Sequence, residues 1–183
     1  MSVRALLIPG SVLLVPGAAG RATVLAEERR AVADAVDACD DTLQAPGVRC
    51  LVAARGERPL RGRSRPSLGA VGLVPGDLTW ASPPGQDGAA AGTAASVGLL
   101  VVGGLTAVEA VDVVEAPTSA QIVGGVGDAL SGRAAAAQVV IVAVDDDVVR
   151  EALAALVADG ALDAVVDTVL GAGQKDTIPA GRP

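Results

Sequence analysis

The chain has 183 residues, a formal net charge of −7 and a hydrophobic fraction of 51%, but it contains no histidine, tyrosine or phenylalanine. Serine and cysteine hydrolases with a catalytic histidine, His-Glu-x-x-His zinc sites and two-histidine iron triads all need an imidazole, so the composition excludes these classes. The negative charge repels phosphate backbones and Trp80 is the one aromatic residue, so we expect no nucleic-acid partner.

Residues 1–54 predict two strands with a helix between them. The apolar run 3–8 ends at Pro9 and Gly10, which is typical of a buried strand followed by a loop. Thr23 can cap the helix that follows. The apolar side chains of that helix recur at helical spacing, at Leu25, Val32, Val36 and Cys39. The second predicted strand spans 49–54.

The segment 55–65 is strongly basic. Its arginines are Arg55, Arg58, Arg61, Arg63 and Arg65, against one acid, Glu57. We interpret it as a solvated loop that contains proline and glycine, with an anion or partner site as the alternative. Residues 68–74 predict a weak strand or turn, and 75–88 an irregular segment.

The remainder of the chain alternates between strands and helices. In chain order we predict a helix over 89–102, a strand over 110–116, a helix from Thr118 to about 130, a strand over 139–144, an amphipathic helix after Asp147 and a last helix over 162–170. The glycines at 124–127 fall inside a predicted helix and match no phosphate-binding motif, so we assign them to helix packing or to a helix break.

This alternation predicts an α/β fold with a largely parallel or mixed central sheet and helices on both faces. We expect a single domain over 1–170 and a disordered tail over 171–183. Cys39 and Cys50 are predicted to be buried free thiols, which fits a cytoplasmic protein. Arg4 and the apolar stretch after it resemble a signal peptide, but Pro9 and Gly10 interrupt that stretch. No uninterrupted apolar run approaches the roughly 18 residues of a membrane span, so we expect no membrane partner.

Ligands in such folds gather at the carboxyl ends of strands. The predicted ends are Pro9–Ser11, Arg55–Glu57, Glu115–Thr118 and Asp145–Asp147. From these we select five candidate ligand-binding residues and assign none a catalytic role. The five are Pro9, Gly10, Ser11, Arg55 and Asp145.

Asp145, Asp146 and Asp147 also raise the question of a metal. Clustered carboxylates are suitable ligands for Mg²⁺ or Ca²⁺. The simpler interpretation, which we prefer, is that one aspartate caps the following helix while its neighbours complement the helix dipole.

The segment 8–20, Ile-Pro-Gly-Ser-Val-Leu-Leu-Val-Pro-Gly-Ala-Ala-Gly, resembles the N-terminal motif of class III extradiol dioxygenase B-subunit-like proteins from actinobacteria. In that family a strand ends in Pro-His-Pro-Pro, and Leu-Leu-Val-Pro follows. The second strand, the loop 60–68 and the alternating elements through Val144 are similar as well. The resemblance implies that the motif's histidine binds Fe(II), which activates O₂ beside a catechol. Gly10 takes the place of that histidine, and the chain has none elsewhere.

Three hypotheses of function follow. The first is a catalytically silent, dioxygenase-like domain without a cofactor, which binds a small molecule or a protein partner in the former catalytic cleft. The second is a Mg²⁺-dependent enzyme that uses Asp145–Asp147 and holds an anionic substrate with Arg55 or Arg58. The third, suggested by the apolar excess, is an oligomerisation module that forms a homo-oligomer.

Overall fold

The architecture is taken from a computed structural model of the chain. It describes residues 2–15, 17–19, 24–37, 48–73, 87–105, 111–131, 138–168 and 178–179. The expectations for Thr23, Cys39 and Trp80 lie outside these residues, as does most of the segment 75–88.

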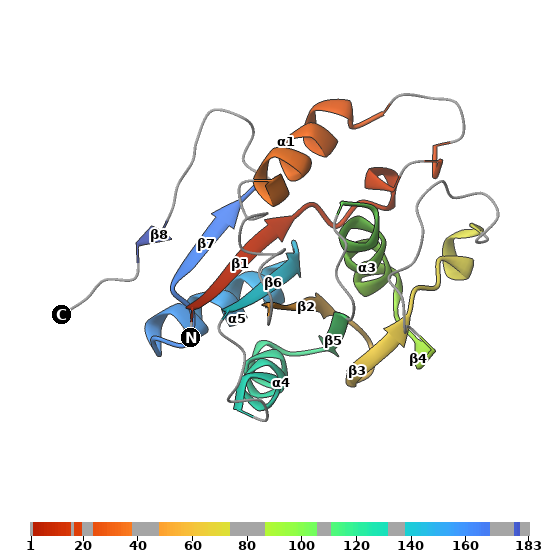
Figure 1. The fold of residues 1–183 in the computed structure, drawn as a ribbon. Helices are drawn as coiled ribbons and strands as arrows, with labels where there is room; N and C mark the ends of the chain where they lie inside the picture. The colour runs from red at the N-terminus through yellow and green to blue at the C-terminus, as the bar shows by residue number, and fades with distance from the viewer. Residues whose placement is uncertain are drawn as a thin grey trace.

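An eight-stranded sheet with the strand order β4-β3-β5-β2-β6-β1-β7-β8 forms the centre of the molecule (Figure 1). The strands are β1 (Ser2–Ile8), β2 (Val48–Arg55), β3 (Leu60–Arg65), β4 (Ala89–Ala90), β5 (Val111–Ala116), β6 (Gln138–Val144), β7 (Ala164–Asp167) and β8 (Ile178–Pro179). The central run β5-β2-β6-β1-β7 is parallel throughout, whereas β3 pairs antiparallel with β5 and β8 pairs antiparallel with β7. The sheet is therefore mixed and largely parallel.

Helices cover both faces of this sheet, which confirms the predicted α/β class. They are α1 (Ala26–Asp37), α3 (Thr93–Leu105), α4 (Ser119–Ser131) and α5 (Asp147–Ala158). Two short 3-10 turns, η1 (Val12–Leu14) and η2 (Gly69–Val71), lie in the loops. No helix of the described residues is long and apolar enough to cross a membrane.

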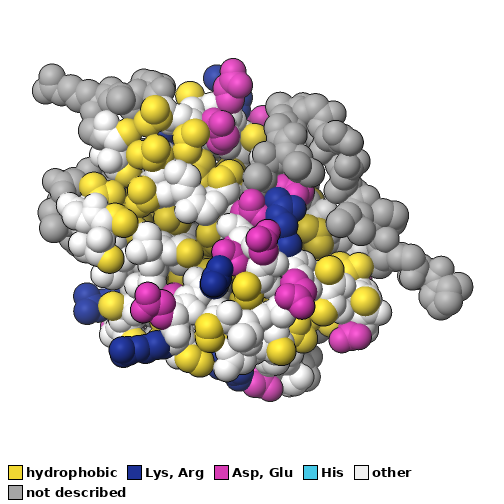
Figure 2. Space-filling view, turned by 180° about the vertical axis from the view of Figure 1, so that it is seen from behind, with side chains coloured by type: hydrophobic (Ala, Val, Ile, Leu, Met, Phe, Trp, Pro, Cys, Tyr) yellow, Lys and Arg dark blue, Asp and Glu magenta, His cyan; other side chains and the backbone are white. Residues whose placement is uncertain are grey.

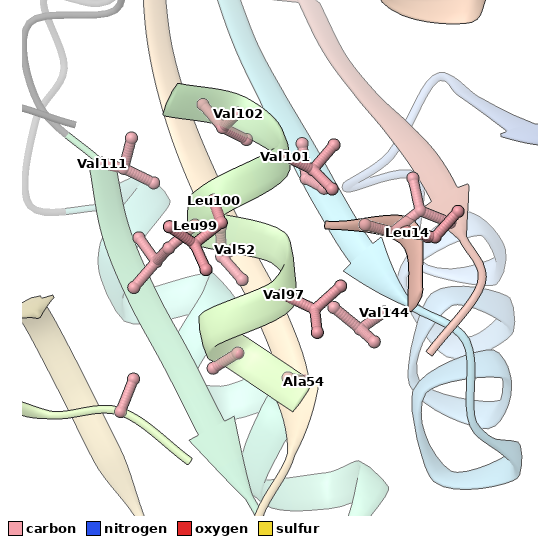
Figure 3. Close-up of a cluster of buried hydrophobic side chains, with 14 of the residues drawn as sticks. Leu14, Val52, Ala54, Val97, Leu99, Leu100, Val101, Val102, Val111 and Val144 are labelled. Carbon is pink, nitrogen blue, oxygen red and sulfur yellow. The ribbon is translucent and has the colours of Figure 1, made fainter. Parts of the chain in front are cut away.

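Two separate hydrophobic clusters hold the layers together, because successive side chains of a strand point to opposite faces. Leu6 and Ile8 of β1 belong to the cluster under α1 and α3, whereas Ala5 and Leu7 belong to the cluster under α4 and α5. Figure 3 shows part of the first cluster, in which valines and leucines of α3 pack on β2, β5 and β6.

The close packing of α3 depends on a small residue. A Cβ atom at Gly98 would lie 2.7 Å from Cγ1 of Val52, closer than real carbon atoms approach. In this core of aliphatic side chains without phenylalanine or tyrosine, glycine allows the helix axis to lie near the sheet.

The structure corrects two predicted elements. Part of the basic loop is strand β3, in which Arg61, Arg63 and Arg65 are exposed while the intervening Ser64 is buried. The last predicted helix is instead strand β7. Its β-branched Val165 and Val166 suit a strand, and the unoccupied edge of β1 provides a pairing partner that the local sequence pattern does not reveal.

The other elements agree with the predictions to within a few residues at their ends. Of the predicted tail 171–183, the structure describes Ile178–Pro179, which pair with β7 as β8. On the face seen in Figure 2, acidic and basic side chains are interspersed among hydrophobic and uncharged ones. That face therefore offers no continuous basic surface.

Candidate functional site

The carboxyl ends of β1, β2, β5 and β6 lie at the same edge of the sheet because these strands are parallel. This juxtaposition was predicted from the sequence. The structure divides the edge into two regions, one around the loops that follow β1 and β6 and one between β5, β3 and the start of α3.

In the first region, the loop after β1 is held against the loop after β6. The backbone N–H of Asp145 donates a 2.7 Å hydrogen bond to the carbonyl of Ile8, and a Cβ atom at Gly10 would lie 3.1 Å from the carbonyl oxygen of Asp145. The Ser11 hydroxyl accepts a 3.2 Å hydrogen bond from the N–H of Leu13 and caps η1. Of the predicted site residues, Gly10, Ser11 and Asp145 therefore make local structural contacts here, next to the half-buried Pro9.

The aspartates of this region have partners in the protein. Asp145 Oδ1 lies 2.5 Å from Nε of Arg150, and Asp167 Oδ2 lies 3.0 Å from Nη1 of the same arginine. The hydrogen bond that Arg150 donates to Asp145, more than the one that it donates to Asp167, raises the pKa of Arg150. This bridge joins the loop after β6 to α5 and β7.

Asp146 has a capping role. Its Oδ1 accepts a 2.9 Å hydrogen bond from the N–H of Val148 and so caps α5, which confirms the predicted cap, whereas Asp145 pairs with Arg150. Its Oδ2 lies 3.4 Å from Nη1 of Arg55. Asp147 is exposed in the first turn of the helix. Within the described ranges, no group of three or more acidic or cysteine side chains is arranged to hold a metal ion.

The second region contains a cleft of about 690 Å³, which we call the Glu115 cleft. It opens between the carboxyl ends of β2 and β5, the chain entering β3, η2 and the start of α3. Its polar side chains are Arg55, Glu57, Arg58, Ser67, Thr93 and Glu115. The rest of its lining is glycine, alanine, proline and leucine. Of the five candidate ligand-binding residues, Arg55 lines this cleft, and so does Arg58, which the second hypothesis named as an anion-binding residue.

Glu115 is the chemically distinctive group of this cleft. It belongs to β5 and is 5% exposed. Its Oε2 accepts a 2.9 Å hydrogen bond from the backbone N–H of Gly92, directly before α3. Burial raises the pKa of this carboxyl, and the hydrogen bond from Gly92 opposes that effect in part.

Two glycines make room for the Glu115 side chain. A Cβ atom would lie 2.1 Å from Glu115 Oε1 if it were added at Gly56, and 2.0 Å from it if added at Gly92. The carboxyl group is therefore enclosed between the end of β2 and the start of α3, where no larger side chain fits without displacing it.

Two arginines of the basic segment lie at the mouth of the cleft. The side chain of Arg55 is 57% exposed and makes the 3.4 Å contact with Asp146 described above. Arg58 is exposed and forms no ion pair with any residue that the structure describes. Arg61, by contrast, faces away from the mouth and pairs with Asp128 of α4.

A buried serine fixes one wall of the cleft. Ser96 Oγ accepts a 2.8 Å hydrogen bond from the N–H of Ser67 and lies 3.2 Å from the carbonyl of Ser67 and 3.3 Å from that of Ala91, to either of which it can donate. These contacts attach the segment before η2 to the start of α3. The wall is therefore built by side chain to backbone hydrogen bonds that tie together residues far apart in the sequence.

The sequence placed Glu115 at the end of a strand but did not single it out. A signal for it was present, since a carboxylate inside the otherwise apolar end of a buried strand needs a structural or functional partner. Gly56 and Gly92 gave no comparable signal, because their proximity arises from the topology.

Comparison with protein-family models, with curated proteins and with solved structures finds no match to this chain.

Proposed function

We propose that this chain is a catalytically silent α/β domain that binds a small polar molecule in the Glu115 cleft. The observation that carries the proposal is the 690 Å³ cleft at the carboxyl edge of the sheet, with a buried carboxyl group inside and arginines at its mouth. Small-molecule sites in α/β folds lie at this edge and typically measure about 300–1,000 Å³.

The burial of Glu115 supports a binding role. An ionised carboxyl group away from water lowers the stability of the folded state unless its charge is compensated. Among the described residues, one backbone N–H and no cationic side chain contacts it. Perturbed groups of this kind in clefts are typical of functional sites.

The dioxygenase resemblance stays in the proposal as an expectation about ancestry and scaffold. Ring cleavage through an iron site is not part of it, because Gly10 stands in place of the motif's histidine and the chain contains no other. A cytoplasmic location is likewise proposed, and the buried free thiol of Cys50 is compatible with it.

The alternative of a Mg²⁺-dependent enzyme at Asp145–Asp147 has less support. A cation there would compete with Arg150 for Asp145, and with Arg55 and the N-terminus of α5 for Asp146. The alternative of a homo-oligomerisation module rests on the apolar composition, and most of the large apolar side chains described are buried in the two clusters.

The test is a fragment screen on the whole chain, observed through backbone amide resonances. We expect small polar fragments to shift the amides of Gly56, Gly92 and Thr93, and the Arg58→Gln variant to weaken those shifts. Arg63→Gln is the matched control, since Arg63 is exposed on β3 and does not line the cleft. If no fragment shifts the cleft amides, or if Arg58→Gln and Arg63→Gln behave alike, the proposal is wrong.

A further inference from the structure

The inner end of the Glu115 cleft is acidic, and among the described residues a single hydrogen bond, donated by Gly92, reaches its carboxyl group. Glu115 Oε2 accepts from Gly92, whereas Oε1 lies against the α-carbons of Gly56 and Gly92, which carry no side chain. A carboxylate only accepts hydrogen bonds. The group that best complements this end is therefore a positively charged donor, and an ammonium group provides both the charge and the protons.

The mouth of the cleft has the opposite charge. Arg55 and Arg58 lie there with Glu57, so the mouth carries two cationic side chains and one acidic side chain. Arg55 is partly engaged by Asp146, and Arg58 has no ion-pair partner among the residues described. A carboxylate presented at the mouth can form a charge-assisted hydrogen bond with the Arg58 guanidinium.

Apart from Ser67 and Thr93, the rest of the lining of the cleft is apolar or glycine. Pro59, Leu60, Ala91 and Ala94 line it, and they offer contact to an aliphatic spacer. A dicarboxylate would be repelled by Glu115, and a diamine by the arginines at the mouth. The charge order of the cleft thus favours a molecule with one charge of each sign.

Building on the proposed function, we infer that the Glu115 cleft binds a small ω-amino carboxylate, a zwitterion that places its ammonium group against Glu115 and its carboxylate against Arg58. The two charged ends of the ligand are separated by a short aliphatic chain that contacts the apolar wall.

The experiment uses probes that differ only in charge and spacing. Calorimetric titration compares glycine, β-alanine, γ-aminobutyrate and ε-aminocaproate with butyrate and butylamine, which each carry one of the two charges. We expect one zwitterion to bind about tenfold more tightly than either single-charge probe. In the Glu115→Gln variant, the best zwitterion should bind no more tightly than butyrate. In the Arg58→Gln variant, it should bind no more tightly than butylamine. Arg63→Gln should leave both differences in affinity unchanged.

Two results would overturn this inference, and they differ from the failure of the proposed function. Equal binding of butyrate or butylamine and the best zwitterion would show that only one end is recognised. Binding of other fragments at the cleft amides, without binding of any zwitterion, would refute the ligand class while the cleft remained a binding site. If no fragment shifts the amide resonances of the cleft, the proposed function itself is refuted. Arg58 is exposed, so Arg58→Gln remains informative even if Glu115→Gln fails to fold.

Discussion

Gly125 of α4 lies so close to Val114 of β5 that a Cβ atom at Gly125 would come within 2.6 Å of Val114 Cγ1. The glycine-rich segment 124–127 lies within α4 and serves helix-to-sheet packing at this position, which is one of the two roles that we expected for it. A Cβ atom at the neighbouring Gly124 would have no atom within 4 Å. A side chain is therefore tolerated at position 124 but not at position 125.

Substitution of these two glycines tests the packing. Gly125→Ala should lower the free energy of unfolding by roughly 1–3 kcal/mol, because α4 must move away from Val114. Gly124→Ala should leave it unchanged or raise it by up to about 1 kcal/mol, because alanine favours a helix over glycine. Denaturant titration of both variants checks this pair, and equal effects would contradict the described packing.

Ser96→Ala should destabilise the wall of the Glu115 cleft. The substitution removes the acceptor of the Ser67 N–H, and a buried donor left without a partner costs about 1–3 kcal/mol. Chemical denaturation measures the loss, and hydrogen exchange of the Ser67 amide locates it. Unchanged protection of that amide would mean that Ser96 does not hold the wall. Ser67→Ala is the control, because the contacts at Ser67 use its backbone and survive the change.

The ionisation of Glu115 should make stability depend on pH in a defined direction. Burial raises the pKa of Glu115 in the folded protein above its ordinary value of 4.5, so the folded state binds this proton more tightly than the unfolded chain. Its contribution to stability is present below pH 4.5 and is lost as the pH rises through the folded pKa.

Glu115→Gln isolates this effect, since glutamine can accept the hydrogen bond from Gly92 and does not titrate. We expect the free energy of unfolding of the unmodified protein, relative to that of the variant, to fall as the pH rises from about 4 towards neutrality. Urea titrations at several pH values measure the difference. A difference that is constant across this range would show that Glu115 is not perturbed by burial.

Cys50 should resist alkylation in the folded protein. It is buried, and burial raises the pKa of its thiol from 9.0 to about 12. Because the thiolate is the nucleophile, iodoacetamide at mildly alkaline pH should modify Cys50 at least about a hundredfold more slowly in native protein than in denaturant. Peptide mapping separates Cys50 from Cys39, and rapid native modification of Cys50 would contradict its burial.

The sequence predicted the parallel core because buried strands are continuous apolar runs. Val139–Val144 is such a run, and Val111–Ala116 is apolar except for Asp112 and Glu115; both segments are strands as expected. The local pattern failed at Leu60–Arg65 and Ala164–Asp167, where a neighbouring strand provides the pairing. These two strands, each second from a margin of the sheet, depend on tertiary partners that no short window of sequence contains.

Part of the candidate site could also be predicted from the sequence. Parallel strand ends share one edge of a sheet, so the positions of Arg55 and Asp145 followed from the predicted order of elements. The enclosure of Glu115 did not follow, because it depends on the distance between the end of β2 and the start of α3. Gly56 and Gly92 are 36 positions apart in the numbering and meet only in the folded chain.

The strands at the two margins of the sheet, β4 and β8, are two residues long. A sheet that ended in a long, flat strand would offer a ladder of unsatisfied amide and carbonyl groups to another chain. Ala89–Ala90 and Ile178–Pro179 instead offer very short templates, and Pro179 has no N–H to donate. Because β4 pairs with only Ser64 and Arg65 of β3, the hindrance to edge-to-edge addition of another molecule is local to these two short strands.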